Sequence, residues 1–149
     1  MTIKIVLATH EDIDAMADLL EILFTQEIEF IPHREKHITV LNEILNNPTL
    51  GTLIVAKQDN ACVGMVLVLY TLSTALGGRV GLLEDMVVLP EKRDLGIGTL
   101  LIEKALTHAK AEGCQRLTLL TDANNNAAHR FYERSGFTHS TMIPFRIHF

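Results

Sequence analysis

A short glycine-containing turn holds the residues best suited to bind an anion. Arg93, Gly96 and Gly98 lie between a predicted strand over residues 80–89 and a predicted helix over residues 98–112. The first N–H groups of a helix have no partner within the helix, and they carry the positive end of its dipole. Glycine lets a ligand approach these groups closely, and Arg93 adds a positive charge. The turn therefore predicts a pocket for phosphate oxygens.

The common nucleotide motifs do not fit this turn. The Gly-Lys-Ser/Thr of a phosphate-binding P-loop is absent from the sequence. A dinucleotide fingerprint needs a third glycine, but Thr99, Leu100 and Leu101 follow Gly98. A nucleotide- or dinucleotide-binding enzyme that uses Gly96 and Gly98 is therefore the weaker alternative. A plain turn with a surface arginine stays open from the glycine pair alone.

A second motif narrows the choice. The pattern N-x-x-A-x-x-F-Y runs from residue 125 to residue 132, on a predicted helix over residues 126–134, and Gly136-Phe137 follows it. Together with R-D-L-G-I-G at residues 93–98, it resembles the GNAT superfamily of acyl-CoA-dependent N-acyltransferases, in both order and spacing. The resemblance is strong over the last half of the chain and rests on the order of the elements in the first half.

This resemblance implies a place for acetyl-CoA between two splayed parallel strands, here residues 80–89 and 116–121. The pantetheine arm would pair with the backbone of Met86, Val87 and Val88. The pyrophosphate would bind N–H groups of the turn, namely Arg93, Asp94, Leu95, Gly96, Ile97, Gly98 and Thr99. Further cofactor contacts are implied for Asn125, Ala128 and Phe131, although Asn125 could instead only cap its helix. Asp94 departs from the small residue frequent in the family, and we expect its side chain to point to solvent.

The implied reaction is direct transfer of acetyl from acetyl-CoA to a primary amine through a ternary complex. Tyr132 occupies the position of the family's tyrosine general acid, which protonates the leaving sulfur. A backbone N–H of Val88 or Val87 would stabilise the oxyanion. An aliphatic amine has a pKa near ~10.4 and arrives protonated, so the site needs a base. Glu84 ranks first, ahead of Asp85 or a water chain, and strand alternation sends these two carboxylates to opposite faces unless a bulge intervenes.

Hydrophobic patterning indicates how these residues are positioned within one domain over residues 1–149. It predicts strands at residues 3–7, 52–57, 61–71, 80–89 and 116–121, and helices at residues 11–24, 33–46, 98–112 and 126–134. This order predicts a GNAT-like α/β fold, with a mixed, mostly antiparallel central sheet flanked by helices and two splayed parallel strands that form the cofactor cleft. Residues 145, 147 and 149 are apolar and alternate with Arg146 and His148. A final strand from residue 137 onward would suit this pattern, packed in the sheet or against a second subunit of a homodimer.

Local signals sharpen these bounds. Thr9 and Asp12 resemble a capping box at the start of the first helix. Gln58-Asp59-Asn60 predicts a hairpin turn. Gly64 within the following strand suggests a bulge or a close backbone approach. Gly113 is expected to end the third helix.

Composition argues against other classes of protein. The chain has 13 basic and 18 acidic residues, and its net charge of −5 is unfavourable for binding nucleic acid or a polybasic attachment to a membrane. The longest apolar run, residues 61–70, is shorter than the ~20 residues of a membrane-spanning helix. Cys62 and Cys114 cannot form a disulfide framework or a structural zinc site, so a reducing, cytoplasmic setting is expected.

Weaker candidates lie in the first half of the chain. His33 and His37 share a helix face, but a metal would need at least one further ligand, so no metal is expected. These two residues, Arg34, Glu27 and Glu29 are weak candidates for contact with the amine, against the alternative of a solvated surface. A non-catalytic acyl-CoA-binding module is the remaining alternative for function.

Overall fold

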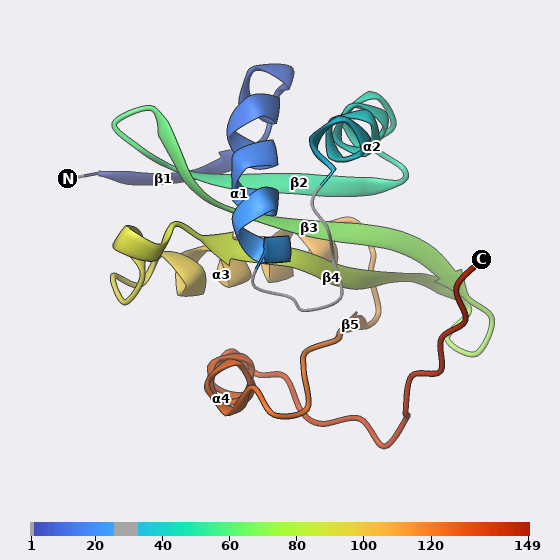
Figure 1. Ribbon diagram of the computed structural model, residues 1–149. Coiled ribbons are helices and arrows are strands. Elements are labelled where there is room, and N and C mark those ends of the chain that lie inside the picture. The colour runs from blue at the N-terminus through green and yellow to red at the C-terminus, as the bar shows by residue number, and fades with distance from the viewer. Residues whose placement is uncertain (1, 26–32) are drawn as a thin grey trace.

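The computed structural model describes residues 2–25 and 33–149, and a five-stranded sheet forms its centre (Figure 1). The strands lie in the order β1-β2-β3-β4-β5. The first four run antiparallel to their neighbours, whereas β5 runs parallel to β4. Their bounds are Ile3–Leu7 for β1, Gly51–Gln58 for β2, Ala61–Ser73 for β3, Gly78–Val88 for β4 and Leu117–Leu119 for β5. This is the mixed, mostly antiparallel α/β sheet that the sequence predicts.

Helices cover both faces of the sheet. α1 (Ile13–Thr25) and α2 (Arg34–Asn46) lie over one face, and α3 (Ile97–Ala111) lies over the other, behind the strands in Figure 1. α4 (Asn126–Arg134) follows β5. Two 3-10 turns precede α1 and α3, namely η1 (His10–Asp12) and η2 (Pro90–Lys92). Within the residues described, no helix has the length and apolar character needed to cross a membrane.

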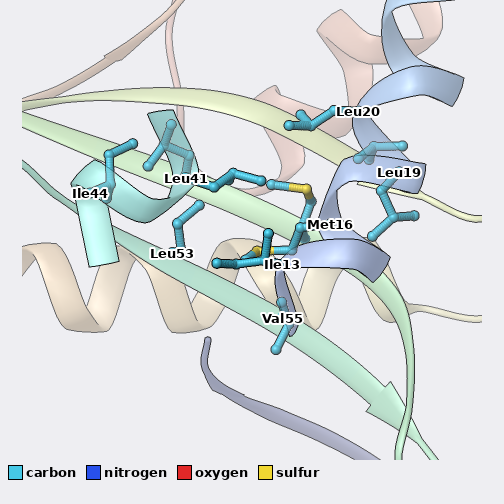
Figure 2. Close-up of a cluster of buried hydrophobic side chains, with 11 residues drawn as sticks. Ile13, Met16, Leu19, Leu20, Leu41, Ile44, Leu53 and Val55 are labelled. Atoms are coloured by element: carbon cyan, nitrogen blue, oxygen red, sulfur yellow. The ribbon is translucent and has the colours of Figure 1, made fainter. Parts of the chain in front are cut away.

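Alternation along the central strands builds two hydrophobic cores. Leu53 and Val55 of β2 belong to the core under α1 and α2, whereas Ile54 and Ala56 belong to the core under α3. Figure 2 shows the first core, in which the fully buried Met16 of α1 lies among leucine and isoleucine side chains from both helices. A fully buried aliphatic side chain contributes ~1.5–3 kcal/mol. Both faces of the sheet therefore hold their helices in a fixed place.

Backbone geometry confirms the predicted β2–β3 hairpin. Asp59 and Asn60 have φ angles of 51° and 69°, which suit a two-residue hairpin turn. A bulge lies beside Gly64, where the β2–β3 register shifts. A Cβ atom at Gly64 would lie 3.1 Å from Leu101 Cδ1 and 3.1 Å from the Val87 carbonyl oxygen. The predicted bulge and the predicted close approach are therefore both present.

Two helix ends also agree with the sequence. The Thr9 N–H donates to Asp12 Oδ2 at 2.8 Å, as the capping box predicts. Gly113 follows α3 with a φ angle of 88°, the left-handed conformation that commonly ends a helix.

The C-terminal segment differs from the prediction. Residues 137–149 are all described, and none of them lies in a strand. Phe145, Ile147 and Phe149 are exposed by 97%, 75% and 114%. A strand needs a neighbour for its backbone groups, and within the described chain β5 pairs with β4 alone. The predicted final strand is therefore wrong for a single copy of the chain.

Candidate functional site

Strands β4 and β5 run side by side for only part of their length. Within the described residues, Gly81–Leu83 of β4 pairs with Leu117–Leu119 of β5. β4 then continues to Val88, while β5 ends two residues short of its predicted end at residue 121. Residues 84–88 therefore have no strand of the described chain on this edge, and backbone groups that face it need other partners. We call these five residues the open edge of β4.

The backbone of Val88 faces this open edge. The Leu89 N–H donates to the Val63 carbonyl at 2.9 Å, immediately beyond Val88 in the β3–β4 register. In an antiparallel ladder this places Val88 at a position whose N–H and carbonyl point away from β3. Its carbonyl accepts a hydrogen bond from Arg93 Nε at 3.1 Å, which agrees with that direction. Val87 directs its groups to β3, so the geometry favours Val88 of the two predicted N–H donors.

A bulge in β4 shifts which face its side chains take. Leu83 packs in the core under α3, whereas Val87 packs in the core under α1 and α2. Residues four apart would share a face in a regular strand. The β3–β4 register accounts for the change, because it leaves both Asp85 and Met86 opposite one residue of β3, and Asp85 has a φ angle of 53°.

The β3–β4 register decides where the Glu84 side chain lies. Glu84 pairs with Leu67, whose side chain belongs to the core under α1 and α2, so the Glu84 side chain lies on that face. It is exposed and begins the open edge. Asp85 is half-buried and has an interaction partner of its own. Glu84 is therefore the carboxylate with a surface position beside α1 and α2.

The start of α3 presents backbone N–H groups at the end of the open edge. The Leu100 N–H donates to the Gly96 carbonyl at 3.2 Å, so the N–H groups of residues 97–99 precede the first hydrogen bond of the helix. Gly96 has a φ angle of 83° and Asp94 one of 62°. These left-handed residues turn the chain sharply into the helix, and the Asp94 side chain is exposed, as expected.

Gly98 brings three elements together. A Cβ atom at Gly98 would lie 3.3 Å from Met86 Cε and 3.3 Å from Phe131 Cζ. The first turn of α3 therefore packs directly against the bulge of β4 and against α4. The two motifs of the sequence, 93–98 and 125–132, meet at this point in space.

Tyr132 lies beside this junction in α4. Its ring makes edge-on contacts with Phe131 and Phe137, at centroid distances of 5.1 Å and 5.9 Å. Burial raises the pKa of the Tyr132 phenol above its ordinary value of 10.0. The phenol is therefore protonated at neutral pH and can act as a proton donor.

The other residues of the second motif have different places in the structure. Asn125 Oδ1 accepts a hydrogen bond from the Ala128 N–H at 3.1 Å, so Asn125 caps α4. Ala128 and Phe131 are half-buried on the same side of α4 as Tyr132. Contacts of these residues with a cofactor stay predictions.

Two of the weaker candidates in the first half of the chain, Arg34 and His37, have structural partners. Arg34 forms ion pairs with Asp18 at 2.6 Å, Glu21 at 3.3 Å and Asp14 at 3.5 Å, which tie α2 to α1. His37 packs against the ring of Phe24 at a centroid distance of 5.0 Å. Glu27 and Glu29 lie outside the described residues.

Neither a metal site nor a reactive cysteine emerges from the described part of the chain. It holds no group of three side chains able to bind a metal ion. Burial raises the pKa of the Cys62 thiol to about 11, so the thiol is protonated at neutral pH. Burial also raises the pKa of Cys114.

A hollow of about 340 Å³ lies between α3 and α4, and no motif of the sequence predicts it. Its lining includes Thr99, Phe131 and Arg134. Phe131 and Arg134 are three residues apart on one helix, so they share a face. This spacing could have indicated from the sequence that Arg134 lies beside the motif residue Phe131. No sequence feature predicted that Arg93 binds the Val88 carbonyl, because this contact depends on the path of the turn in space.

The chain is similar to known proteins in sequence and in fold. Residues 14–137 match the model of the family described as "Acetyltransferase (GNAT) family". An aminoalkylphosphonate N-acetyltransferase from Salmonella typhimurium is 28% identical over 133 residues, which cover 89% of this chain and 83% of that protein. The uncharacterized N-acetyltransferase YhfO from Bacillus subtilis is 29% identical over 91 residues. That second match covers 61% of each chain, so it spans less than two thirds of the relative.

A solved structure supports the fold. It is a protein from Clostridium acetobutylicum described as a predicted acetyltransferase with acetyl-CoA, and it superposes with a TM-score of 0.80. The comparison covers 97% of this chain and 96% of that one, at 18% identity. At this identity the likeness concerns the fold alone.

Proposed function

Because the chain belongs to the GNAT acetyltransferase family, we propose that it transfers acetyl from acetyl-CoA to a primary amine by direct attack in a ternary complex. One observation carries this proposal. The open edge of β4 leads directly to the unpaired N–H groups at the start of α3. An extended ligand with amide groups can add to a strand edge, and a diphosphate suits a helix N-terminus. Coenzyme A has both features in that order.

The residues present fit this cosubstrate. The backbone of Met86 and Val88 would hold the pantetheine arm, whereas the predicted contact of Val87 is disfavoured because its backbone groups face β3. The turn from Arg93 to Thr99 would hold the diphosphate. The hollow between α3 and α4 offers Phe131 and Arg134 to the adenosine end. Bound acetyl-CoA supplies an activated thioester, and the protein positions it.

Three groups of the chain would carry the proton and charge changes. The Val88 N–H, which points to the open edge, donates to the thioester oxygen as negative charge develops there. Tyr132 gives a proton to the leaving sulfur, since its phenol is protonated at neutral pH. Glu84 accepts the proton of the amine from the α1 and α2 face, directly or through water. Asp85 is the second choice for this base.

The acceptor is a small-molecule or peptide amine. The Salmonella relative is named for aminoalkylphosphonates, so an aminoalkylphosphonate belongs in the acceptor panel beside polyamines, amino acids and peptides with a free N-terminus. We propose in addition that residues 1–149 act as a single domain, in the cytoplasm and as a homodimer.

Two measurements test the proposal. Thermal unfolding should shift upward with acetyl-CoA or CoA, by the equivalent of ~2.7 kcal/mol at a concentration one hundred times Kd, and should not shift with ATP or NAD. Release of free CoA should then depend on an amine from the panel. Stabilisation by ATP or NAD instead would favour the nucleotide-binding alternative. Stabilisation by CoA without turnover on any amine would favour the non-catalytic binding module.

A further test locates the cosubstrate. Titration of labelled protein with CoA should shift the backbone amide resonances of Gly96, Gly98 and Thr99, and those of Met86 and Val88 on the open edge. The amides of β1, the strand at the opposite edge of the sheet, serve as the control. Binding of CoA that left residues 96–99 unchanged would contradict the assigned site.

A further inference from the structure

The side chain of Arg93 binds a backbone acceptor at the end of the open edge of β4. Its Nε donates a hydrogen bond to the Val88 carbonyl at 3.1 Å. Within the described part of the chain, this carbonyl is the one hydrogen-bond partner of the side chain, and no carboxylate forms an ion pair with it. The guanidinium is exposed and carries five N–H donors in a planar fork. Most of its capacity to bind an anion is therefore unused in the free protein.

The Val88 carbonyl is an acceptor that a ligand extended along the open edge needs. Val88 lies at a position of the β3–β4 ladder whose N–H and carbonyl point away from β3. A ligand with amide groups that adds to this edge pairs with such a residue through both groups, as a neighbouring strand does. Arg93 donates to the same oxygen from the side that the ligand approaches. An amide N–H of the ligand therefore competes with Arg93 Nε for the Val88 carbonyl.

A diphosphate in the adjoining turn offers Arg93 a stronger partner. Residues 89–96 connect the end of β4 to the start of α3, where the N–H groups of residues 97–99 are unpaired (Figure 1). A guanidinium binds a phosphate group through two parallel hydrogen bonds between opposite charges, whereas the Val88 carbonyl offers one neutral acceptor. A diphosphate at the start of α3 therefore draws Arg93 from this carbonyl.

We propose that Arg93 makes the protein selective for acyl donors that carry a diphosphate beside the pantetheine arm. This inference rests on the proposed function and adds a coupling between two parts of the donor. In the free protein, Arg93 occupies the Val88 carbonyl and hinders a pantetheine arm that arrives alone. A diphosphate engages Arg93 and frees the carbonyl, so each part of the donor promotes binding of the other. Acylated pantetheine, and phosphopantetheine attached to a carrier protein, lack the diphosphate and are disfavoured as donors.

Two fragments of coenzyme A test this coupling directly. Pantetheine is titrated into labelled protein with and without saturating inorganic pyrophosphate, and the amide resonance of Val88 reports its binding. Pyrophosphate should lower the Kd of pantetheine by about fivefold or more, and the reverse effect should be equal, because coupling between two sites is reciprocal. Arg93→Met should abolish the coupling. Independent binding of the two fragments to the wild type, or an unchanged coupling in Arg93→Met, would overturn the proposal.

The same variant should affect pantetheine and CoA in opposite directions. Arg93→Met should bind pantetheine alone about fivefold more tightly than the wild type, because the binding-competent state no longer competes with the Arg93 contact. It should bind CoA more weakly in calorimetry, because it loses a contact with the diphosphate. An Arg93 that contacts only the diphosphate predicts an unchanged affinity for pantetheine, and an Arg93 that only braces the turn predicts weaker binding of both ligands. Either result would contradict the proposal.

Lys92→Met is the matched control. Lys92 is the last residue of η2, and its loss removes the same charge from the turn. Its side chain has no hydrogen bond to β4 within the described residues, so the variant should keep the coupling between pyrophosphate and pantetheine. If Lys92→Met lost the coupling as fully as Arg93→Met, charge alone would account for the effect and the proposal would be wrong.

The carbonyl carbon resonance of Val88 reports the hydrogen bond itself. It should shift in Arg93→Met, and it should shift in the wild type when pyrophosphate is added, although pyrophosphate has no amide groups. The response to pyrophosphate should be absent in Arg93→Met. A Val88 carbonyl that ignored both changes would contradict the release of Arg93. Binding of CoA at residues 96–99 without any coupling would remove only this role of Arg93, whereas CoA that left those amides unchanged would contradict the proposed function.

Discussion

The Tyr132 phenol is protonated at neutral pH, and a protonated phenol can give its hydrogen to a leaving thiolate. Burial raises the pKa of this phenol further, through the packing of Tyr132 among Phe131, Phe137 and the core under α3. Val88 and Val87 likewise differ in the direction of their backbone groups. The N–H of Val88 points to the open edge of β4, whereas that of Val87 points to β3. Single residues of this site thus take their chemistry from the position of their neighbours.

Tyr132→Phe should lower kcat by about 10²-fold or more, because general acid catalysis contributes ~10²–10⁴-fold. The KM for acetyl-CoA should change little, since the ring is retained. Tyr70→Phe is the matched control, because the Tyr70 hydroxyl bonds to Thr52 at 2.6 Å within the β2–β3 pair. Equal turnover of Tyr132→Phe and wild type in steady-state kinetics would remove Tyr132 from the acid role.

Gly96→Ala and Gly113→Ala form a second matched pair. Both glycines have left-handed φ angles, 83° and 88°, and a Cβ atom would meet no neighbour within 4 Å at either position. Alanine should therefore cost each about 1–2 kcal/mol of stability from backbone strain alone. Only Gly96→Ala should also weaken binding of CoA, measured by calorimetry, because only Gly96 shapes the turn into α3. Equal affinity in both variants would contradict a role for that turn.

At the scale of elements, an ion pair of one buried carboxylate connects the start of α1 to the sheet. Asp12 is 5% exposed and lies 2.9 Å from Lys57 Nζ of β2. Burial by itself raises the pKa of Asp12, but hydrogen bonds from Lys57 and the Thr9 N–H outweigh it and leave the pKa below 3.8. The hydrogen bond to Asp12 likewise raises the pKa of Lys57.

These shifts fix the sign of the pH dependence. The folded state releases the Asp12 proton more readily than the unfolded chain, so the pair stabilises the fold above the unfolded pKa near ~3.9. This contribution is lost as pH falls through the lower folded value. Asp12→Asn should reduce the free energy of unfolding at pH 7 by about 1–3 kcal/mol, and by less at pH 3. Urea denaturation at both pH values measures it, with the exposed Asp14→Asn as control, and an equal loss at pH 7 and pH 3 would contradict the ion pair.

At the scale of the whole molecule, the sheet joins two cores into one body. β2, β3 and β4 send alternate side chains into each core, so neither core can be lost without exposing the other side of the same strands. The open edge of β4 lies where this sheet ends its pairing with β5, and α3 and α4 meet there. The candidate site therefore depends on both layers.

Met16→Ala and Ile102→Ala test this coupling, one in each core. Both side chains are fully buried, at 0% exposure, so each variant should lose ~2–5 kcal/mol of stability. Chemical denaturation followed by circular dichroism and by tyrosine fluorescence should show one coincident transition for both variants. Two separate transitions in either variant would show that the cores unfold independently.

The sequence by itself determined the elements and the two motifs, because hydrophobic period, caps and turn glycines act over a few residues. It predicted the helix at Asn126–Arg134 to the residue and the glycine turn before α3. Only the tertiary structure decided what depends on distant partners. Pairing between segments far apart in the chain sets the register that places Glu84 on the α1 and α2 face and the end of β5 that opens the edge. It also sets the contact of Gly98 with Met86 and Phe131, and it leaves residues 137–149 outside the strands of the described chain. Local residue patterns contain no information on such pairing, since it is set by the register and packing of the whole sheet.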